Sequence, residues 1–506
     1  MVRIATILRF RVRHTLNVIH MSTIQDLSPK AVWRNFYSLT QIPRPSGHCE
    51  KVSQFLVDFG KKLGLESFID DAGNVIIRKP ATPGMEDCKG VILQAHMDMV
   101  PQKLVDVQHD FTTDPIQAWV DGEWVKAKGT TLGADDGLGV AAIMAVLESK
   151  DIKHGPLEAL ITRDEETGMF GAFDLKGGIL KGEILLNLDS ETEGEIYIGC
   201  AGGLNIGASL EYKPEPVEEG LVARCLELKG LRGGHSGIEI GLGRANGIKM
   251  LGRVVHDLIV EFGAQIASFN GGTMRNAIPR DGKAVLLFDK DEDFSELDAY
   301  VKDYERQLNK EYETIESGIS LTLTEVALPQ TAMPLEIQDN MINVILAIQD
   351  GVLRVIPTVP DTVETSSNLA IVEMAEGKVS MKILARSSSD DMKDYLADCL
   401  SACFNMAGMK VECTGGYSGW QPDVNSPILA AMVKSYQKQF GTPAQIKVIH
   451  AGLECGVIGA VYPGMDMVSF GPTLESPHTP DERANIPSVT KFYDFLVSTL
   501  ESTPKK

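Results

Sequence analysis

The chain has 506 residues, of which 43% are hydrophobic and 23% are charged, and its 69 acidic against 48 basic residues give a formal net charge of −21. A surface this negative repels phosphate backbones, and no apolar stretch approaches the roughly 20 residues that cross a bilayer, so we expect neither nucleic acid nor membrane as a partner. The length exceeds what one hydrophobic core usually serves and predicts two domains.

The first 20 residues form a basic segment with four arginines and no acidic residue. Such a composition fits a transit peptide or a short signal. Because Met21 opens a segment that resembles the start of a domain, we favour the interpretation that residues 1–20 are an extension from an upstream start and not native. The eight cysteines are scattered without a CxxC pair. This argues against a disulfide framework and predicts a protein of the reducing cytoplasm.

Two helices are predicted before the first strand. Ser28 and Pro29 suit the start of one helix, and Ser46 with Glu50 precedes a second helical pattern that Gly64 closes. The apolar residues of this second pattern recur at helical spacing: Val52, Phe55, Leu56, Phe59 and Leu63.

Short apolar runs then alternate with a helical pattern, in the rhythm of βαβ units. The runs are Val91–Ala95, Leu157–Thr162 and Ile184–Leu188, with a helix near Leu138–Ser149. Strands that are apolar throughout are buried on both faces, as in a mostly parallel sheet covered by helices.

The middle of the chain has a different pattern. Strands there alternate strictly between apolar and polar residues, as in Val379–Ala385, and they accompany amphipathic helices such as Phe294–Tyr312. An antiparallel sheet with helices on one face fits this pattern. Apolar strands of the first kind return at Ile446–Ile449 and Met467–Phe470. We therefore predict an α/β fold in which an α+β domain is inserted into the first one, with glycine-rich hinges at 199–203 and 415–419.

The predicted domain limits are 21–202 and 417–506 for the two parts of the first domain, and 203–416 for the inserted domain. These limits follow the change of strand pattern and the glycine clusters.

Ligand-type side chains follow the buried runs. His96 and Asp98 come after the first run, Asp164-Glu165-Glu166 after the second, and Asp189 after the third, while Asp135-Asp136 opens the helix. Sites in open α/β sheets form outside the carboxyl ends of the strands, so these stretches can converge. Each alone is ordinarily a local hydrogen bond, a surface turn or a solvated helix start. Four such stretches, each directly after a strand or opening a helix, favour one shared site.

So many carboxylates in one place would repel each other unless cations compensate them, which predicts a metal pair. Mixed imidazole and carboxylate ligands favour zinc, and manganese or cobalt would suit the same donors. Asp98 can hydrogen-bond the His96 imidazole. Of the adjacent Glu165 and Glu166, one can bind metal while the other faces the substrate water.

Six motifs together resemble the M20 metallopeptidases, and within them the aminoacyl-histidine dipeptidase branch. In chain order they are HMDMVPQ from residue 96, GADDGLG from 133, DEETGMFGA from 164, NLDSE from 187, GGHSG from 233 and SPHTPDER from 476. The resemblance covers nearly the whole chain from Met21 onward.

The resemblance implies the metal ligands. In such enzymes His96 and Asp189 would bind different metals and Asp135 would bridge the two, followed by a cis peptide. Glu166 and His478 would complete the set.

The resemblance also implies a mechanism. Glu165 would act as general base on a metal-bridging water, and Asp98 would orient His96. Chemistry of this kind needs no protein nucleophile, so Ser190 and Ser236 are interpreted as structural.

Further groups are expected from outside the metal cluster, and His235, Asn276 and Arg386 among them lie in the inserted domain, which the resemblance makes a lid and a dimerisation domain. His235 would stabilise the oxyanion, with a turn histidine between glycines as the alternative. Asn276 and Arg386 would bind the substrate carboxylate, and the backbone N–H groups at Gly452 would donate hydrogen bonds to the same carboxylate. His450, in the same HAGLECG stretch, is expected to lie beside the site or in the core.

We therefore expect a two-zinc dipeptidase, and the resemblance implies substrates that include the Xaa-His and β-Ala-His types and a homodimer formed through the lid. The rivals are an N-acyl amino acid deacylase or a tripeptidase of the same fold, and a non-catalytic binding protein. A binding protein should have lost a ligand or the base, and none of these residues is missing.

Overall fold

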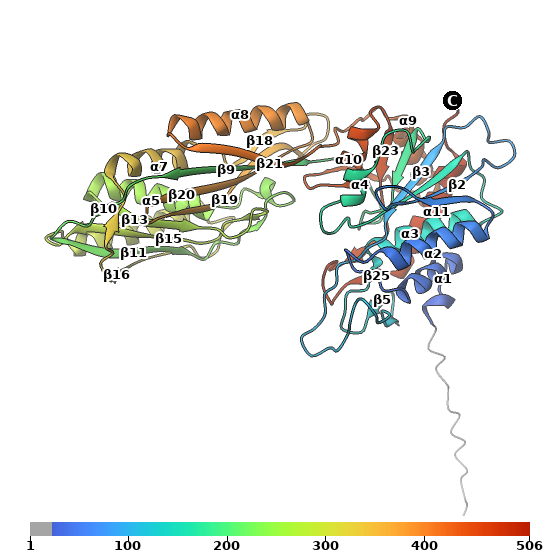
Figure 1. Cartoon of the computed structure of the whole chain (residues 1–506), viewed down its shortest axis with the longest axis horizontal. Coiled ribbons are helices and arrows are strands. Elements are labelled where there is room, and N and C mark those ends of the chain that lie inside the picture. Colours follow the sequence, from blue (N-terminus) through green and yellow to red (C-terminus); the bar gives the residue numbers. More distant parts are fainter. Residues whose placement is uncertain (1–22) are drawn as a thin grey trace, which may run out of the picture.

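The computed structural model describes residues 23–506, and the predicted extension of residues 1–20 lies outside this range. The chain forms two parts joined end to end, each built on its own large sheet (Figure 1). Among the helices of residues 23–506, none is both long and apolar enough to cross a membrane.

The first sheet has eight strands in the order β1-β2-β6-β3-β7-β23-β8-β22. Its centre is parallel, since β3 pairs in parallel with β6 and β7, and β7 with β23. Antiparallel pairing occurs at β1-β2-β6 and between β23 and β8. The strands are β1 Glu66–Ile69, β2 Val75–Lys79, β3 Val91–His96, β6 Leu157–Thr162, β7 Ile184–Asn187, β8 Glu195–Cys200, β22 Gln445–Ile449 and β23 Asp466–Ser469.

Helices cover both faces of this sheet, which is why its central strands are apolar throughout. Val91, Leu93 and Ala95 of β3 belong to the core shared with the helices of one face, and Ile92 to the core of the other face. The first face is covered by α1 Lys30–Thr40, α2 Glu50–Lys62, α3 Ala134–Glu148, α9 Pro427–Phe440 and α11 Ile486–Glu501, and the second by α4 Phe170–Asp174 and α10 Glu454–Val461.

A small four-stranded sheet holds the segment that carries His478. Its order is β24-β25-β5-β4, so the C-terminal hairpin pairs with strands from early in the chain. The strands are β4 Ala118–Asp121, β5 Trp124–Ala127, β24 Leu474–Glu475 and β25 Arg483–Asn485. Residues 476–482 form the connection between β24 and β25, and this connection reaches the edge of the first sheet where β3 ends.

The second sheet is antiparallel throughout, in the order β16-β11-β15-β13-β19-β20-β9-β21, with β18 paired to β19. The strands are β9 Gly202–Glu211, β11 Leu221–Lys229, β13 Gln265–Gly271, β15 Gly282–Asp289, β16 Ser320–Val326, β18 Gly351–Val355, β19 Val363–Ala375, β20 Lys378–Ser387 and β21 Lys410–Tyr417.

Four helices cover one face of this second sheet and share a core with it. They are α5 Gly247–Phe262, α6 Phe294–Glu311, α7 Leu335–Ala347 and α8 Asp390–Met406. The chain enters through β9 and leaves through β21, which are paired neighbours (Figure 1). The predicted α/β fold with an inserted antiparallel lid is confirmed, and we call the part built on the second sheet the lid. The domain limits set from the sequence stay a prediction.

Two predicted helix starts differ in detail. Helix α1 begins at Lys30, so Pro29 occupies the N-cap position instead of the first turn. The N-cap of α2 is Cys49, and Ser46 does not cap this helix. The Ser46 hydroxyl instead donates a hydrogen bond to Asp98 Oδ2 at 2.7 Å, because the chain turns back toward the end of β3 there.

Candidate metal centre and substrate site

Five segments of the chain converge at the carboxyl edge of the first sheet. His96 ends β3, Asp135 opens α3, Glu166 follows β6, Asp189 follows β7, and His478 comes from the β24–β25 connection. Two three-residue groups offer ligand atoms that all lie within 4.8 Å of one another: His96, Asp135 and Asp189 form one, and Asp135, Glu166 and His478 form the other. A third such group joins His96 to Glu165 and Glu166.

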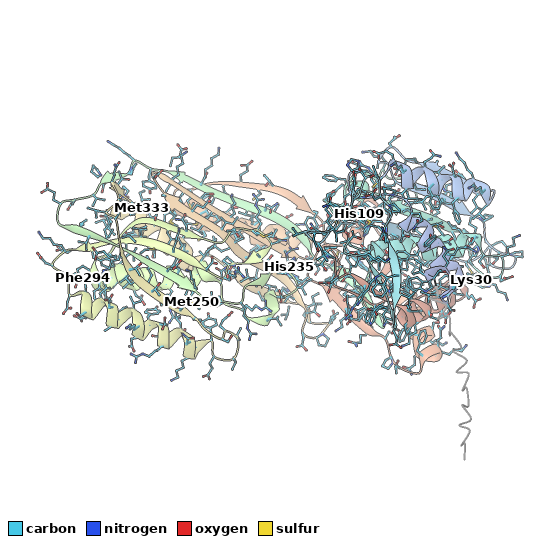
Figure 2. The ribbon with its side chains drawn as sticks, turned by 90° about the horizontal axis from the view of Figure 1, so that it is seen from below. Lys30, His109, His235, Met250, Phe294 and Met333 are labelled. Carbon is cyan, nitrogen blue, oxygen red and sulfur yellow. The ribbon has the colours of Figure 1, made fainter. Side chains whose placement is uncertain are left out.

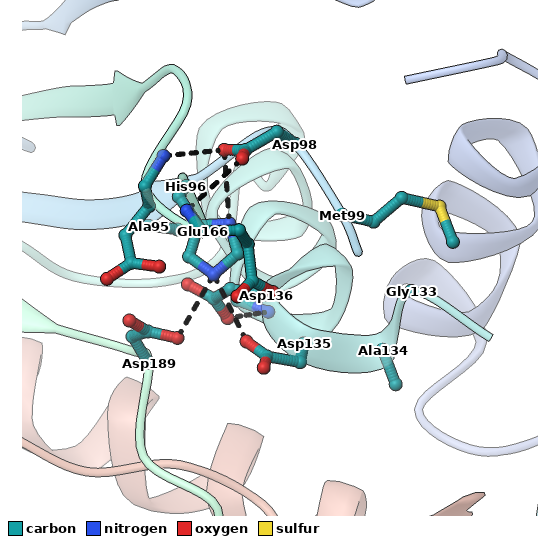
Figure 3. Close-up of polar contacts among 12 residues, drawn as sticks. Ala95, His96, Asp98, Met99, Gly133, Ala134, Asp135, Asp136, Glu166 and Asp189 are labelled. Atoms are coloured by element: carbon teal, nitrogen blue, oxygen red, sulfur yellow. Dashed lines mark hydrogen bonds and ion pairs between the residues drawn. The ribbon is translucent and has the colours of Figure 1, made fainter. Parts of the chain in front are cut away.

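Asp135 belongs to both of the first two groups and divides its oxygens between them. Its Oδ1 lies 3.1 Å from His96 Nε2, and its Oδ2 lies 3.1 Å from His478 Nε2. His96 Nε2 is also 3.4 Å from Asp189 Oδ1, and His478 Nε2 is 3.1 Å from Glu166 Oε2. Figure 3 shows the His96, Asp135 and Asp189 side chains turned toward one point. The Asp135–Asp136 peptide is cis.

This geometry does not agree with the assignment of His96 and Asp189 to different metals. The two side chains lie in one group because β3 and β7 are hydrogen-bonded neighbours in the sheet. Glu166 and His478 form the partner group on the other side of Asp135.

Several buried titratable groups of this cluster have shifted pKa values. Burial raises the pKa of Asp189 well above its usual range, and it raises the pKa of Glu165 to about 8, with the neighbouring carboxylates adding to the effect. Hydrogen bonds to Asp135 and Glu166 raise the pKa of His478 to about 11. Burial lowers the pKa of His96, but Asp189, Asp135 and Asp98 outweigh it and raise that pKa well above normal.

These donors fit divalent cations. The two imidazoles and three carboxylates are the ligand types that zinc takes in hydrolytic sites. Glu166 Oε1 is buried and has no hydrogen-bond partner among the described residues, so it is free to accept a metal. A cation placed between the carboxylates would also compensate the negative charge that they bring together in a buried region.

Asp98 holds two parts of the site together. Its Oδ1 lies 3.5 Å from His96 Nδ1 and accepts the amide of Glu165 at 3.1 Å, while its Oδ2 accepts the amide of Glu166 at 3.3 Å (Figure 3). Asp98 therefore orients the turn that carries both glutamates in addition to the imidazole. Asp164, the first residue of the acidic triplet, turns away and accepts the amide of Gly47 at 2.6 Å.

His235 and Asn276 lie next to each other in the lid. His235 ends the two-residue strand β12 Gly234–His235, which pairs with β14 Ala277–Ile278, and the amide of Ser236 donates to the Asn276 carbonyl at 2.8 Å. His235 Nδ1 accepts the amides of Gly237 and Ile238, so the ring carries its proton on Nε2. Figure 2 places His235 where the lid meets the first sheet. Burial and Arg386 lower the pKa of His235, which keeps the ring neutral.

Arg386 lies within β20, with only 5% of its surface exposed. Its Nη1 donates to the Tyr417 hydroxyl at 3.3 Å, and its Nε is buried without a partner among the described residues. Gly452 packs against the same tyrosine, because a Cβ there would lie 3.1 Å from the ring. The structure thus brings Arg386 and Gly452 together around Tyr417, which the sequence did not single out.

Two further residues near the site are buried: His450, which was expected beside the site or in the core, and Glu454, which the sequence did not single out. His450 Nε2 lies 2.7 Å from Ser366 Oγ of β19, so this buried histidine joins the first part of the molecule to the lid. Burial and Arg386 lower the pKa of His450 to about 3. Glu454 is fully buried and accepts hydrogen bonds from Gln94 and Thr162 at 2.6 Å each. A glutamate opening an otherwise apolar helix was the one hint in the sequence.

No hydrogen bond or ion pair within residues 23–506 joins the lid residues His235, Asn276 or Arg386 to the five clustered donors. The structure therefore holds two separate polar groups, one at the edge of each sheet. Dipeptide chemistry would require both groups to contact the same substrate.

Residues 92–502 match the model of peptidase family M20/M25/M40. The cytosol non-specific dipeptidase of Escherichia coli is 45% identical over 486 residues, which cover 96% of this chain and 100% of that protein.

Solved structures agree in fold. The crystal structure of aminoacylhistidine dipeptidase from Vibrio alginolyticus superposes with a TM-score of 0.91 at 45% identity, covering 96% of this chain and 99% of that one. The aminopeptidase PepT of Bacillus cereus shares the fold at 17% identity, with a TM-score of 0.56 over 94% of this chain and 99% of that one.

Proposed function

The chain belongs to peptidase family M20/M25/M40 and is a peptidase, and we propose that it hydrolyses dipeptides with two divalent metal ions. The observation that carries this proposal is the position of Asp135, whose two oxygens face the imidazoles of His96 and His478 at 3.1 Å each. The printed names of the Escherichia coli and Vibrio relatives, both dipeptidases, support the substrate class.

In the proposed site His96 and Asp189 would hold one ion, Glu166 and His478 would hold the other, and Asp135 would be shared by both. Zinc suits this donor set best, with manganese and cobalt as alternatives. When bound, such a pair lowers the pKa of a coordinated water toward about 7 and polarises the scissile carbonyl.

Glu165 is the proposed general base. It lies in the same turn as Glu166. One of its carboxylate oxygens lies within 4.8 Å of the ring nitrogen of His96 and of a carboxylate oxygen of Glu166. Its carboxylate would accept a proton from the attacking water and deliver it to the leaving amine. Asp98 would support this step by holding both the His96 ring and the backbone of Glu165 in place.

The lid group would bind the rest of the substrate. The Nε2–H of His235 is suited to donate to the oxygen that becomes negative as the carbonyl is attacked. Arg386, with the side chain of Asn276 and the backbone at Gly452, would bind the free carboxylate that every dipeptide carries. Recognition of that carboxylate limits the substrate length on one side.

Two further proposals concern the setting of the enzyme. We place it in the cytoplasm, which the name of the Escherichia coli relative supports.

We also propose a homodimer formed through the lid. Its edge strand β18 supports this, because Val352, Leu353 and Val355 are 38%, 40% and 54% exposed. Sedimentation of the purified protein tests the second proposal, and a monomer at micromolar concentration would contradict it.

The function is tested by a substrate panel assayed on metal-loaded protein. We expect Ala-His and β-Ala-His to be hydrolysed, and the activity to disappear with a chelator and return with zinc. Cleavage of N-acetyl amino acids alone, or of tripeptides alone, would replace the dipeptidase proposal with a deacylase or a tripeptidase.

A further inference from the structure

Glu482 is a buried carboxylate that binds four consecutive backbone amides. Its Oε2 accepts the amides of Leu132 and Gly133 at 2.6 and 2.9 Å, and its Oε1 accepts those of Ala134 and Asp135 at 2.7 and 3.3 Å. Leu132 and Gly133 precede α3, and Ala134 and Asp135 open it, so none of the four amides has an intrahelical acceptor. The last of the four belongs to the residue proposed to bridge the metals.

The position of Glu482 in the chain gives this contact a second consequence. Glu482 lies four residues after His478, on the same connection between β24 and β25. Its hydrogen bonds therefore tie the segment that carries His478 to the segment that carries Asp135, two residues that are 343 positions apart in the sequence.

Arg44 holds the same loop from another side. Its Nη1 donates to the carbonyls of Met97 and Asp98 at 3.0 and 2.9 Å, and its Nη2 donates to the carbonyl of Gly133 at 2.5 Å. The guanidinium is fully buried. A Cβ at Gly133 or Gly137 would lie 2.6 or 2.5 Å from Nη2, so glycine at these two positions makes room for the arginine.

We infer that Arg44 and Glu482 are positioning residues for the metal centre: together they fix the loop 132–135 against His96 and His478 before any metal binds. We call this pair the Arg44–Glu482 clamp. Within residues 23–506, the side chains of Arg44 and Glu482 make no hydrogen bond or ion pair with the five clustered metal-ligand side chains. The clamp is needed because the clustered carboxylates repel one another without a cation, and loops free to separate would have to be ordered at each binding event. The inference rests on the proposed metal site.

Two variants test the clamp by different chemistry. Glu482→Gln keeps the shape but sets an amide NH2 against two of the four backbone donors. Arg44→Lys keeps the positive charge but loses the planar fork that reaches three carbonyls. Outer-shell partners of metal ligands typically contribute 10–100-fold in affinity, so we expect each variant to bind zinc about 10–100-fold more weakly while still holding two ions at saturation.

The matched control is Glu158→Gln. Glu158 is also a buried carboxylate on the first sheet, and it accepts the amides of Lys181 and Gly182 at 2.6 and 2.7 Å, but it lies at the amino end of β6, the edge of the sheet opposite the metal centre. We expect this variant to lose thermal stability and to change zinc affinity by less than about twofold, since distant sites act independently.

Zinc affinity is measured by titrating metal-free protein against a competing chelator, with wild-type protein first. A wild-type protein that binds no zinc would contradict the proposed function itself. A wild-type protein that binds two ions, with Glu482→Gln and Arg44→Lys unchanged in affinity, would refute the clamp and leave the function standing. An equal loss in Glu158→Gln would also refute the clamp, because general destabilisation would then explain the effect.

Hydrogen exchange on the metal-free wild-type protein tests the clamp without any variant. We expect the amides of 132–135 to exchange as slowly as those of the buried strand β3. Fast exchange that slows only when zinc is added would mean that the metal, and not the clamp, orders the loop.

Discussion

The two sheets of this molecule carry their polar groups in different ways. In the first sheet helices cover both faces, so the strands are apolar, and the five clustered donors lie at or just beyond strand ends, at the start of α3 or on a connection. In the lid, helices cover one face of the sheet, and Arg386 lies within strand β20, while His235 and Asn276 lie at the short antiparallel pairing of β12 with β14. The first arrangement brings donors from distant segments to one point. The second presents single groups toward a neighbouring part of the molecule.

This difference predicts separate effects on the reaction. Changes at the first sheet should alter the chemical step or metal binding. Changes in the lid should leave metal content intact and act through the substrate. The following variants test whether the effects at the two sheets are separate in this way.

The largest effect is expected for Glu165→Gln, at the first sheet. Removing a general base typically costs about 10²–10⁴-fold in rate, so kcat should fall by that factor while two metal ions remain bound. Steady-state kinetics and metal analysis of the same sample measure both quantities. Asp174→Asn, an exposed acidic residue beyond the same turn, is the control. Near-normal turnover in Glu165→Gln would remove Glu165 as the base.

His235→Ala, in the lid, should lower kcat by about 10²–10³-fold, the usual effect of losing an oxyanion donor. Metal content should not change, because no contact joins His235 to the clustered donors within residues 23–506. His256→Ala, a lid histidine that is 40% exposed, should behave like the wild type. A loss of bound metal in His235→Ala would break the division between the two sheets.

Arg386→Lys should act mainly on substrate binding. A hydrogen bond to a charged group contributes about 1.5–3 kcal/mol, so kcat/KM for dipeptides should fall by at least about tenfold, with most of the change in KM. The control is Arg253→Lys, since Arg253 also makes a two-pronged contact, with Glu311 on the lid surface. An unchanged KM would show that the substrate carboxylate is bound elsewhere.

The last variant is expected to have the smallest effect on the reaction, because it changes only the stability of the lid. Burial raises the pKa of the Asp350 carboxyl from 3.8 to about 6, so this group binds a proton more tightly in the folded lid than in the unfolded chain. The stability that this proton provides is present below pH 4 and is lost as the pH rises toward 6. Asp350→Asn keeps the oxygen that accepts the Leu369 amide at 2.7 Å and removes the charge.

We therefore expect Asp350→Asn to raise the free energy of unfolding at pH 7 by up to about 3 kcal/mol, with little change at pH 4. Unfolding followed at both pH values measures this difference, and kcat should be unaffected. A variant that is less stable than the wild type at pH 7 would contradict the assignment.

Much of the first sheet could be predicted because strands buried on both faces leave a strong signal. The apolar runs ending in His96 and Asp189 were placed within one residue of β3 and β7. Which of these ends lie side by side depends on strand order, which the sequence does not encode locally. The assignment of His96 and Asp189 to different metals, which the resemblance implied, does not agree with this strand order, although both residues lie at strand ends as expected.

Residues that act through long-range backbone contacts were harder to find. Nothing near Arg44 or Glu482 in the sequence shows that they meet at loop 132–135, since their partners are backbone atoms and carry no residue signature. Tyr417 likewise packs against Gly452, and His450 contacts Ser366, across the boundary between the two parts. Such contacts need the fold before they can be seen.

The central claim is that Asp135 joins two metal sites into one centre. The most direct test is the zinc stoichiometry of metal-free protein, measured for the wild type and for Asp135→Asn. Two ions per chain in the wild type, and a weakening of both together in the variant, is the predicted result. A wild-type protein that saturates at one ion, or a variant that binds two ions as tightly as the wild type, would contradict the account.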